Sequence, residues 1–121
     1  MRKILIIDDD EDFREDVSEI LLLSNYVTLL AEDGKSGVEK ALREKPDIIL
    51  CDVAMPNLDG FSVFHILSRH PETGGIPFIF MTGKNDIADI RRGMSMGADD
   101  YLVKPFDETD LLNSVEMRLN K

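Results

Sequence analysis

Acidic, hydroxyl and cationic side chains follow four short apolar runs in this 121-residue sequence. The run at 4–7 leads into three consecutive aspartates, and the run at 48–51 leads into one aspartate. The run at 78–81 is followed by a threonine, and the run at 101–103 by a lysine. These side chains are Asp8, Asp9, Asp10, Asp52, Thr82 and Lys104. If the four runs are parallel strands of one sheet, their carboxyl ends bring these groups to the same sheet edge.

Such a set of side chains is suited to metal-assisted phosphoryl transfer. Crowded carboxylates repel one another and cannot all stay ionised without a cation. Oxygen-only ligands suit a hard ion such as Mg²⁺, which binds one or two carboxylates together with phosphate oxygens. A lysine and a hydroxyl match the remaining phosphoryl oxygens, and this reaction depends mainly on positioning and charge neutralisation. An aspartate can itself be the nucleophile and form an acyl phosphate.

The alternation of apolar runs and helical patterns predicts how these strands are connected. A fifth apolar run, Val27–Ala31, ends at Glu32, Asp33 and Gly34, and we expect this strand end to lie to one side of the others. All five runs are short and nearly all apolar, which is typical of strands buried on both faces. The segments between them have apolar residues at helical spacing, and Asp10 and Asp86 are placed to cap helices. Five βα units predict an α/β fold in which helices cover both faces of a parallel sheet.

Length and charge limit the possible partners and locations. A chain of 121 residues fits one domain, which we place at 1–121. The 24 acidic and 14 basic residues give a formal net charge of -10, which argues against direct nucleic acid or membrane partners. The single cysteine, Cys51, indicates a reducing compartment. Because no signal peptide or membrane-spanning run is visible, we expect a cytoplasmic protein.

An EF-hand calcium loop is an alternative interpretation of the first acidic cluster. The sixth loop position, where the sharp turn requires glycine, is Phe13, and the apolar spacing through this segment is helical. We therefore predict a helix here rather than a calcium loop. The residues that match the EF-hand spacing are Asp8, Asp10, Asp12, Asp16 and Glu19.

Four motifs together resemble the receiver domain of two-component response regulators. They are the segments 4–10 (ILIIDDD), 51–60 (CDVAMPNLDG), 80–83 (FMTG) and 97–106 (GADDYLVKPF). They occur in the order and at the spacing of that family, and the similarity covers essentially the whole chain. The resemblance implies a flavodoxin-like (βα)5 fold with a doubly wound parallel sheet and strand order 2-1-3-4-5.

The resemblance also implies roles for individual residues. Asp52 would accept a phosphoryl group from a sensor histidine kinase or a phosphotransfer protein. Asp9 and Asp52 would bind Mg²⁺, with Asp8 contributing through water and the backbone carbonyl of Ala54 as a further ligand. Lys104 would bridge to the phosphorylated Asp52.

The same resemblance implies a conformational switch. Thr82 would move toward the phosphoryl group, Tyr101 would turn inward behind it, and the Lys104–Pro105 bond would be cis. The face of the fourth helix, fifth strand and fifth helix would meet partners, including a second copy of the chain. Two positions tune the phosphoryl lifetime in this family, and because one of them is Ala54, with Lys84 at the other, we expect dephosphorylation not to be fast.

Rival functions come from other classes of protein. A haloacid-dehalogenase-like phosphatase needs a second aspartate two residues after the nucleophile, where this chain has Ala54. The main alternative is a pseudo-receiver that binds proteins without phosphorylation, but loss of Asp52, Asp9 or Lys104 would mark one, and all three are present. We therefore expect a phosphoacceptor with self-phosphorylation and self-dephosphorylation chemistry rather than a turnover enzyme. A C-terminal output domain in a longer regulator is compatible with this sequence.

Overall fold

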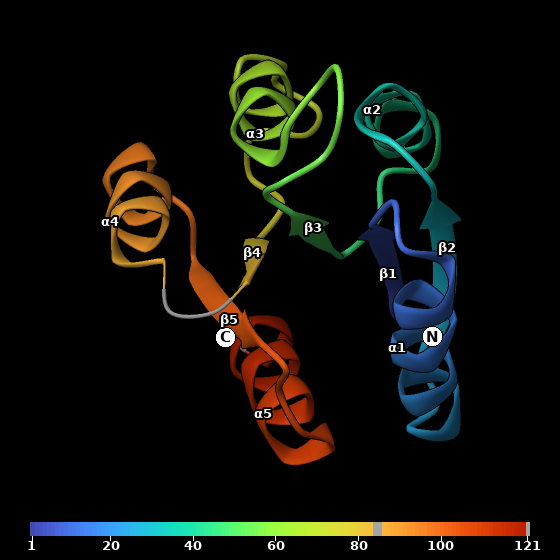
Figure 1. The fold of residues 1–121 in the computed structure, drawn as a ribbon. Coiled ribbons are helices and arrows are strands. Elements are labelled where there is room, and N and C mark those ends of the chain that lie inside the picture. The colour runs from blue at the N-terminus through green and yellow to red at the C-terminus, as the bar shows by residue number, and fades with distance from the viewer. Residues whose placement is uncertain (84–85, 121) are drawn as a thin grey trace.

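The computed structural model describes residues 1–83 and 86–120, which form a parallel sheet with helices on both faces (Figure 1). The strands within this part of the chain are β1 (Lys3–Ile7), β2 (Val27–Ala31), β3 (Ile48–Asp52), β4 (Phe78–Gly83) and β5 (Asp100–Lys104). The helices are α1 (Glu11–Leu23), α2 (Gly34–Glu44), α3 (Gly60–Ser68), α4 (Ile87–Met96) and α5 (Glu108–Leu119).

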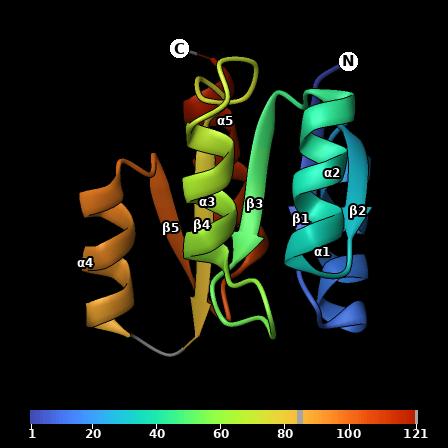
Figure 2. The ribbon, with the colours of Figure 1, turned by 90° about the horizontal axis from the view of Figure 1, so that it is seen from above.

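The order of the strands confirms the predicted topology. The sheet runs β2-β1-β3-β4-β5, and every neighbouring pair is parallel. Helices α1 and α5 cover one face, while α2, α3 and α4 lie side by side over the other (Figures 1 and 2). No helix in the described ranges is long and apolar enough to cross a membrane.

The apolar strands divide their side chains between two cores. In β1, Leu5 and Ile7 join the core beneath α2 and α3, whereas Ile4 and Ile6 join the core beneath α1 and α5. All four side chains are fully buried, as expected for a strand covered on both faces. Because the central strands are enclosed in this way, their carboxyl ends are held in fixed relative positions.

An aspartate caps the start of every helix in the described residues. In each case the side chain accepts a hydrogen bond from the backbone N–H three residues later, which satisfies a donor that the helix leaves free. The sequence predicted two of these caps, Asp10 and Asp86. It did not predict the other three, Asp33, Asp59 and Asp107. Asp12, Asp16 and Glu19 lie inside α1, so this segment is a helix and not an EF-hand loop.

The turn between β3 and α3 depends on a glycine. A Cβ atom at Gly60 would lie 2.3 Å from the carbonyl oxygen of Asp52 and 2.9 Å from the Cα of Val53. The Gly60 N–H also donates to the Val53 carbonyl at 2.9 Å. Because the atoms that a side chain would meet belong to the backbone, they cannot rotate out of its way. Gly60 therefore lets α3 begin directly against the end of β3.

We predict that Gly60→Ala lowers the free energy of unfolding by about 1–3 kcal/mol, because the added methyl group must displace backbone next to Asp52. Urea unfolding followed by circular dichroism measures the change. Gly75→Ala is the matched control, since a Cβ there meets no described atom within 4 Å and its φ is not in the left-handed region. Equal urea midpoints for the two variants would show that the turn tolerates a side chain.

Candidate functional site

The chemistry-bearing residues lie at the carboxyl ends of neighbouring strands. Asp8 and Asp9 follow β1, and Asp52 is the last residue of β3, which pairs directly with β1. From β1 the chain continues to β2 on one side of the sheet and from β2 returns to β3 on the other, so these strand ends flank the topological switch point. Thr82 lies in β4, and Lys104 ends β5. The sequence predicted this convergence, although Asp52, Thr82 and Lys104 belong to their strands rather than following them.

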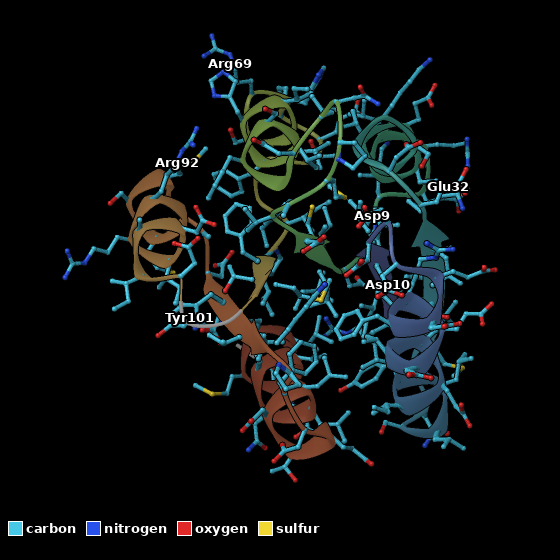
Figure 3. The ribbon with its side chains drawn as sticks, in the orientation of Figure 1. Asp9, Asp10, Glu32, Arg69, Arg92 and Tyr101 are labelled. Atoms are coloured by element: carbon cyan, nitrogen blue, oxygen red, sulfur yellow. The ribbon has the colours of Figure 1, made fainter. Side chains whose placement is uncertain are left out.

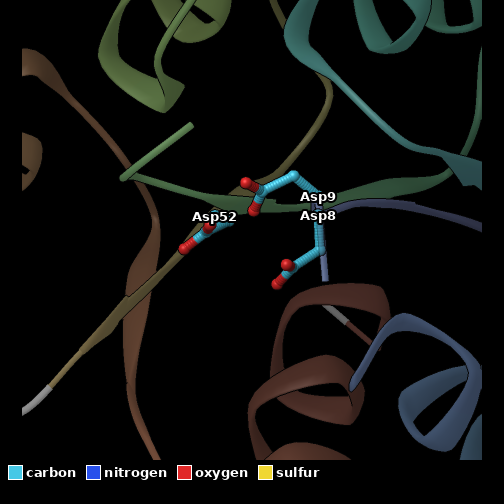
Figure 4. A group of neighbouring side chains, drawn as sticks. All are labelled: Asp8, Asp9 and Asp52. Carbon is cyan, nitrogen blue, oxygen red and sulfur yellow. The ribbon is translucent and has the colours of Figure 1, made fainter. Parts of the chain in front are cut away.

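Three carboxylates form a compact group at this edge (Figure 4). Asp8, Asp9 and Asp52 each offer one oxygen, and these oxygens all lie within 4.8 Å of one another. Asp8 is fully buried and Asp52 is 6% exposed, while Asp9 is exposed. Asp10 points to the start of α1 instead and accepts from the Phe13 N–H (Figure 3). Hard oxygen donors at this separation fit a divalent cation such as Mg²⁺.

Lys104 provides the positive charge of the site. Its Nζ lies 2.7 Å from Oδ2 of Asp8 and 3.3 Å from Oδ1 of Asp52. The ammonium also lies over the ring of Phe13, 4.2 Å from its centroid, and Phe106 packs edge-on against that ring. The closest partner of Lys104 in this structure is therefore Asp8 rather than Asp52, a contact that the sequence did not predict.

Asp8 is fixed from several sides. Its Oδ1 accepts from the Asp10 N–H at 2.9 Å, while its Oδ2 accepts from Lys104. Its own N–H donates to the Ala31 carbonyl at 3.1 Å, and its carbonyl accepts from Arg14 Nη1 at 2.6 Å. Both oxygens of Asp8 thus already have donors, whereas the exposed Asp9 is open to a ligand. The contribution of Arg14 has no signal in the sequence, because it depends on how α1 packs beside β1.

Burial and neighbouring charge alter the pKa values of the central pair. Burial, and then the charge of Asp8, raise the pKa of Asp52 from 3.8 to about 6, although Lys104 opposes this shift. Burial by itself lowers the pKa of Lys104, but the hydrogen bond to Asp8 and the charge of Asp52 outweigh it and raise that pKa. Lys104 is therefore protonated at neutral pH, whereas Asp52, with a pKa of about 6, loses its proton only as the pH approaches neutrality.

The remaining predicted site residues have distinct environments. Thr82 is 1% exposed, and its hydroxyl has no hydrogen-bond partner within the described residues, which is unusual for a buried polar group. It lies one residue beyond Met81, the partner of Asp52 in the sheet. Tyr101 on β5 is 38% exposed (Figure 3). Ala54 is exposed and offers no polar side chain to the site.

The predictions for the Lys104–Pro105 bond and for Lys84 have different outcomes. The Lys104–Pro105 bond is cis, as the resemblance implied. Lys84 lies outside the described residues, so the expected slow dephosphorylation stays a prediction.

Comparison with known proteins decides the family. The model of the response regulator receiver domain matches residues 4–116. The chain belongs to the response regulator receiver domain family. This receiver domain is 40% identical over its full length to the DNA-binding dual master transcriptional regulator RpaA of Synechocystis, covering 50% of that protein. It is 40% identical over 115 residues to Protein PilH of Pseudomonas aeruginosa, covering 95% of each chain.

Solved structures of receiver domains confirm the fold. A putative response regulator from Chloroflexus aurantiacus superposes with a TM-score of 0.95 at 31% identity, covering 99% of this chain and 98% of that one. The Vibrio cholerae chemotaxis protein CheY4 gives a TM-score of 0.92 at 30% identity, covering 98% of this chain and 99% of that one. The receiver domain spans about half the length of RpaA and of the response regulator ArlR of Staphylococcus saprophyticus. These likenesses confirm a two-component signalling domain of flavodoxin-like topology.

We predict that Asp52→Asn stabilises the receiver domain at neutral pH when divalent cations are chelated. The pKa of Asp52 is raised in the folded state, so the stability that this group contributes is present below about pH 4 and is lost as the pH rises to about 6. Removing the ionised carboxylate at about pH 7.5 should therefore raise the free energy of unfolding by about 1–2 kcal/mol. Urea unfolding at several pH values measures this difference.

The gain from Asp52→Asn should disappear at about pH 4, where wild-type Asp52 is protonated. Asp16→Asn, an exposed change on α1, is the control and should leave stability nearly unchanged at both pH values. A gain of the same size at both pH values would show that ionisation of Asp52 is not its cause.

Proposed function

We propose that this receiver domain accepts a phosphoryl group onto Asp52 in a Mg²⁺-dependent reaction and thereby switches a binding surface. The observation that carries the proposal is the group of three carboxylates facing one lysine, beside a buried threonine hydroxyl without a partner in the described residues. Each of these groups matches a part of a bound phosphoryl group or its cation. A structural role alone gives no reason for burying an unsatisfied hydroxyl one residue beyond the strand partner of Asp52.

The donor in this proposal is a phosphohistidine of a sensor histidine kinase or a phosphotransfer protein. An Asp52 oxygen attacks the phosphorus, and the phosphorus–nitrogen bond breaks while its electron pair stays with the imidazole. The product is an acyl phosphate on Asp52. Mg²⁺, when bound by Asp9, Asp52 and the Ala54 carbonyl, supplies charge neutralisation for the phosphoryl oxygens. Asp8, whose oxygens already have donors, contributes through water.

Two side chains respond to the new phosphoryl group. Lys104 lies 3.3 Å from Asp52, so a small shift lets its ammonium pair with a phosphoryl oxygen. The hydroxyl of Thr82 gains a partner by donating to another oxygen. When Thr82 moves, it leaves space behind its side chain. Tyr101 turns into this space from its exposed position on β5. The phosphoryl charge thus biases the surface of α4, β5 and α5 between two states.

The switched surface meets partners in this account. A second copy of the chain is one of them, and a C-terminal output domain in a longer regulator is another. The domain acts in the cytoplasm and carries its own phosphorylation and dephosphorylation chemistry, without turning over a substrate as an enzyme does. The chain covers half of RpaA and 95% of PilH. Its relatives therefore include a longer regulator that contains a receiver as well as a protein that consists of little more than a receiver.

We predict that the intact mass increases by one phosphoryl group after incubation with Mg²⁺ and acetyl phosphate. Asp52→Asn should gain none, because the nucleophile is absent, and chelation of Mg²⁺ should prevent the gain in wild type. Asp16→Asn removes an exposed carboxylate in the middle of α1, outside the group of three carboxylates, and should be phosphorylated like wild type. Reduction of the acyl phosphate followed by peptide mapping identifies the modified residue.

A folded wild-type protein that gains no mass would contradict the proposal. It would favour the pseudo-receiver, which binds proteins without phosphorylation. A gain that persists in Asp52→Asn would instead show that the acceptor is wrongly assigned.

A further inference from the structure

A groove lies between α3 and α4, away from the carboxylate site. It has a volume of about 240 Å³ and is lined by Phe61, Ser62, His65, Ile66, Arg92 and Met96. We call it the α3–α4 groove. Its floor is apolar, and its one charged lining residue is Arg92, which is exposed.

Among the described residues, the lining of the groove carries one arginine and no carboxylate, whereas the chain as a whole is acidic. Ser62, His65, Ile66 and Arg69 are spaced three or four residues apart and therefore lie along one face of α3 and its C-terminal cap. Helix α3 contains no acidic residue, although the whole chain has 24 acidic residues against 14 basic ones. Figure 3 shows Arg69 at the end of α3 and Arg92 on α4 projecting away from the sheet. The lining of the groove thus carries a positive charge on a protein of net charge -10, while the nearby carboxylates of Asp59, Asp86 and Asp89 lie outside that lining.

Arg92 is oriented before any partner binds. Its guanidinium lies over the ring of Phe61, 4.3 Å from the ring centroid. Asp89 of α4 does not line the groove, although it lies near Arg92: burial and the cap Asp86 raise the pKa of Asp89, and the charge of Arg92 opposes this shift. Stacking on an aromatic ring reduces the conformational freedom that Arg92 loses when it pairs with a carboxylate.

Both walls of the groove rest on the same aromatic ring. Phe61 of α3 packs against Phe80 with ring centroids 5.2 Å apart. On α4, a Cβ at Gly93 would lie 2.7 Å from Phe80, so the helix backbone sits directly on this ring. The shared support fixes the width of the groove, as a preformed binding site requires.

We propose that the α3–α4 groove binds an acidic amphipathic segment of a partner protein. Apolar side chains of that segment would fill the floor formed by Phe61, Ile66 and Met96, while a flanking carboxylate pairs with Arg92. Charge complementarity selects this occupant, because the charged residue in the lining is Arg92 and no described carboxylate lines the groove. An arginine stacked on an aromatic ring next to an apolar pocket has the composition of a binding hot spot. The groove shares α4 with the surface of α4, β5 and α5 that the proposed function uses, but its other wall is α3 and its lining includes no residue of β5 or α5 among the described residues.

Two synthetic helical peptides test the proposal with the full ¹⁵N-labelled chain. Both have the same leucine stripe, and its flanks are glutamates in one peptide and lysines in the other. Net charge alone predicts that the acidic protein prefers the lysine peptide. We predict instead that the glutamate peptide gives saturable amide shifts at the groove-lining residues and that added salt weakens its binding.

Two arginine variants test whether Arg92 contributes to binding of the glutamate peptide. Arg92→Ala should weaken binding of the glutamate peptide by about tenfold, while Arg91→Ala, the neighbouring exposed arginine outside the lining, should change it less than about twofold. Unchanged dispersion of the other amide signals shows that each variant is folded.

Three results would overturn the proposal. The first is absence of saturable binding by the glutamate peptide, and the second is equal binding by Arg92→Ala and wild type. The third is concentration-dependent self-association that Arg92→Ala abolishes, measured by sedimentation, since a second copy of the chain would then occupy the groove.

Discussion

The structure depends on the repulsion of three carboxylates held at one edge of a parallel sheet. Asp8, Asp9 and Asp52 bring oxygens within 4.8 Å of one another, and Lys104 supplies one ammonium against them. Two of the three carboxylates are buried, where an unpaired charge is costly. This cost keeps the pKa of Asp52 raised, and a further cation would reduce the cost. In the function that we propose, the same imbalance of charge makes the site respond to an added phosphoryl group.

The rest of the fold holds this unfavourable arrangement in place. Strands β1 and β3 are fully enclosed between two helical layers, so the aspartates at their ends cannot move apart without disturbing both cores. Gly60 lets α3 begin against the carbonyl of Asp52. On the other side of the sheet, Phe13 of α1 places its ring beneath the ammonium of Lys104. Packing energy from the two cores thus offsets the electrostatic cost at their shared edge.

Much of this arrangement could be predicted from the sequence, for a definite physical reason. Parallel strands place their carboxyl ends together, so Asp8, Asp9, Asp52, Thr82 and Lys104 could be assigned to one edge from the apolar runs before them. What could not be predicted depends on packing between distant segments. The preference of Lys104 for Asp8 is a contact across 96 positions, and the hydrogen bond from Arg14 depends on the placement of α1. Of the helix caps, Asp33, Asp59 and Asp107 were missed because the expected boundaries relied on apolar spacing.

The most direct test of this account is the dependence of the unfolding free energy on Mg²⁺ concentration. If the three carboxylates form a cation site, wild-type stability should rise with the logarithm of the Mg²⁺ concentration once the site begins to fill. Asp9→Asn should be at least as stable as wild type without the cation and should lose most of this dependence, because one ligand and one repulsive charge are removed together. Unfolding of wild type that is insensitive to Mg²⁺, or an equal response in Asp9→Asn, would contradict the account.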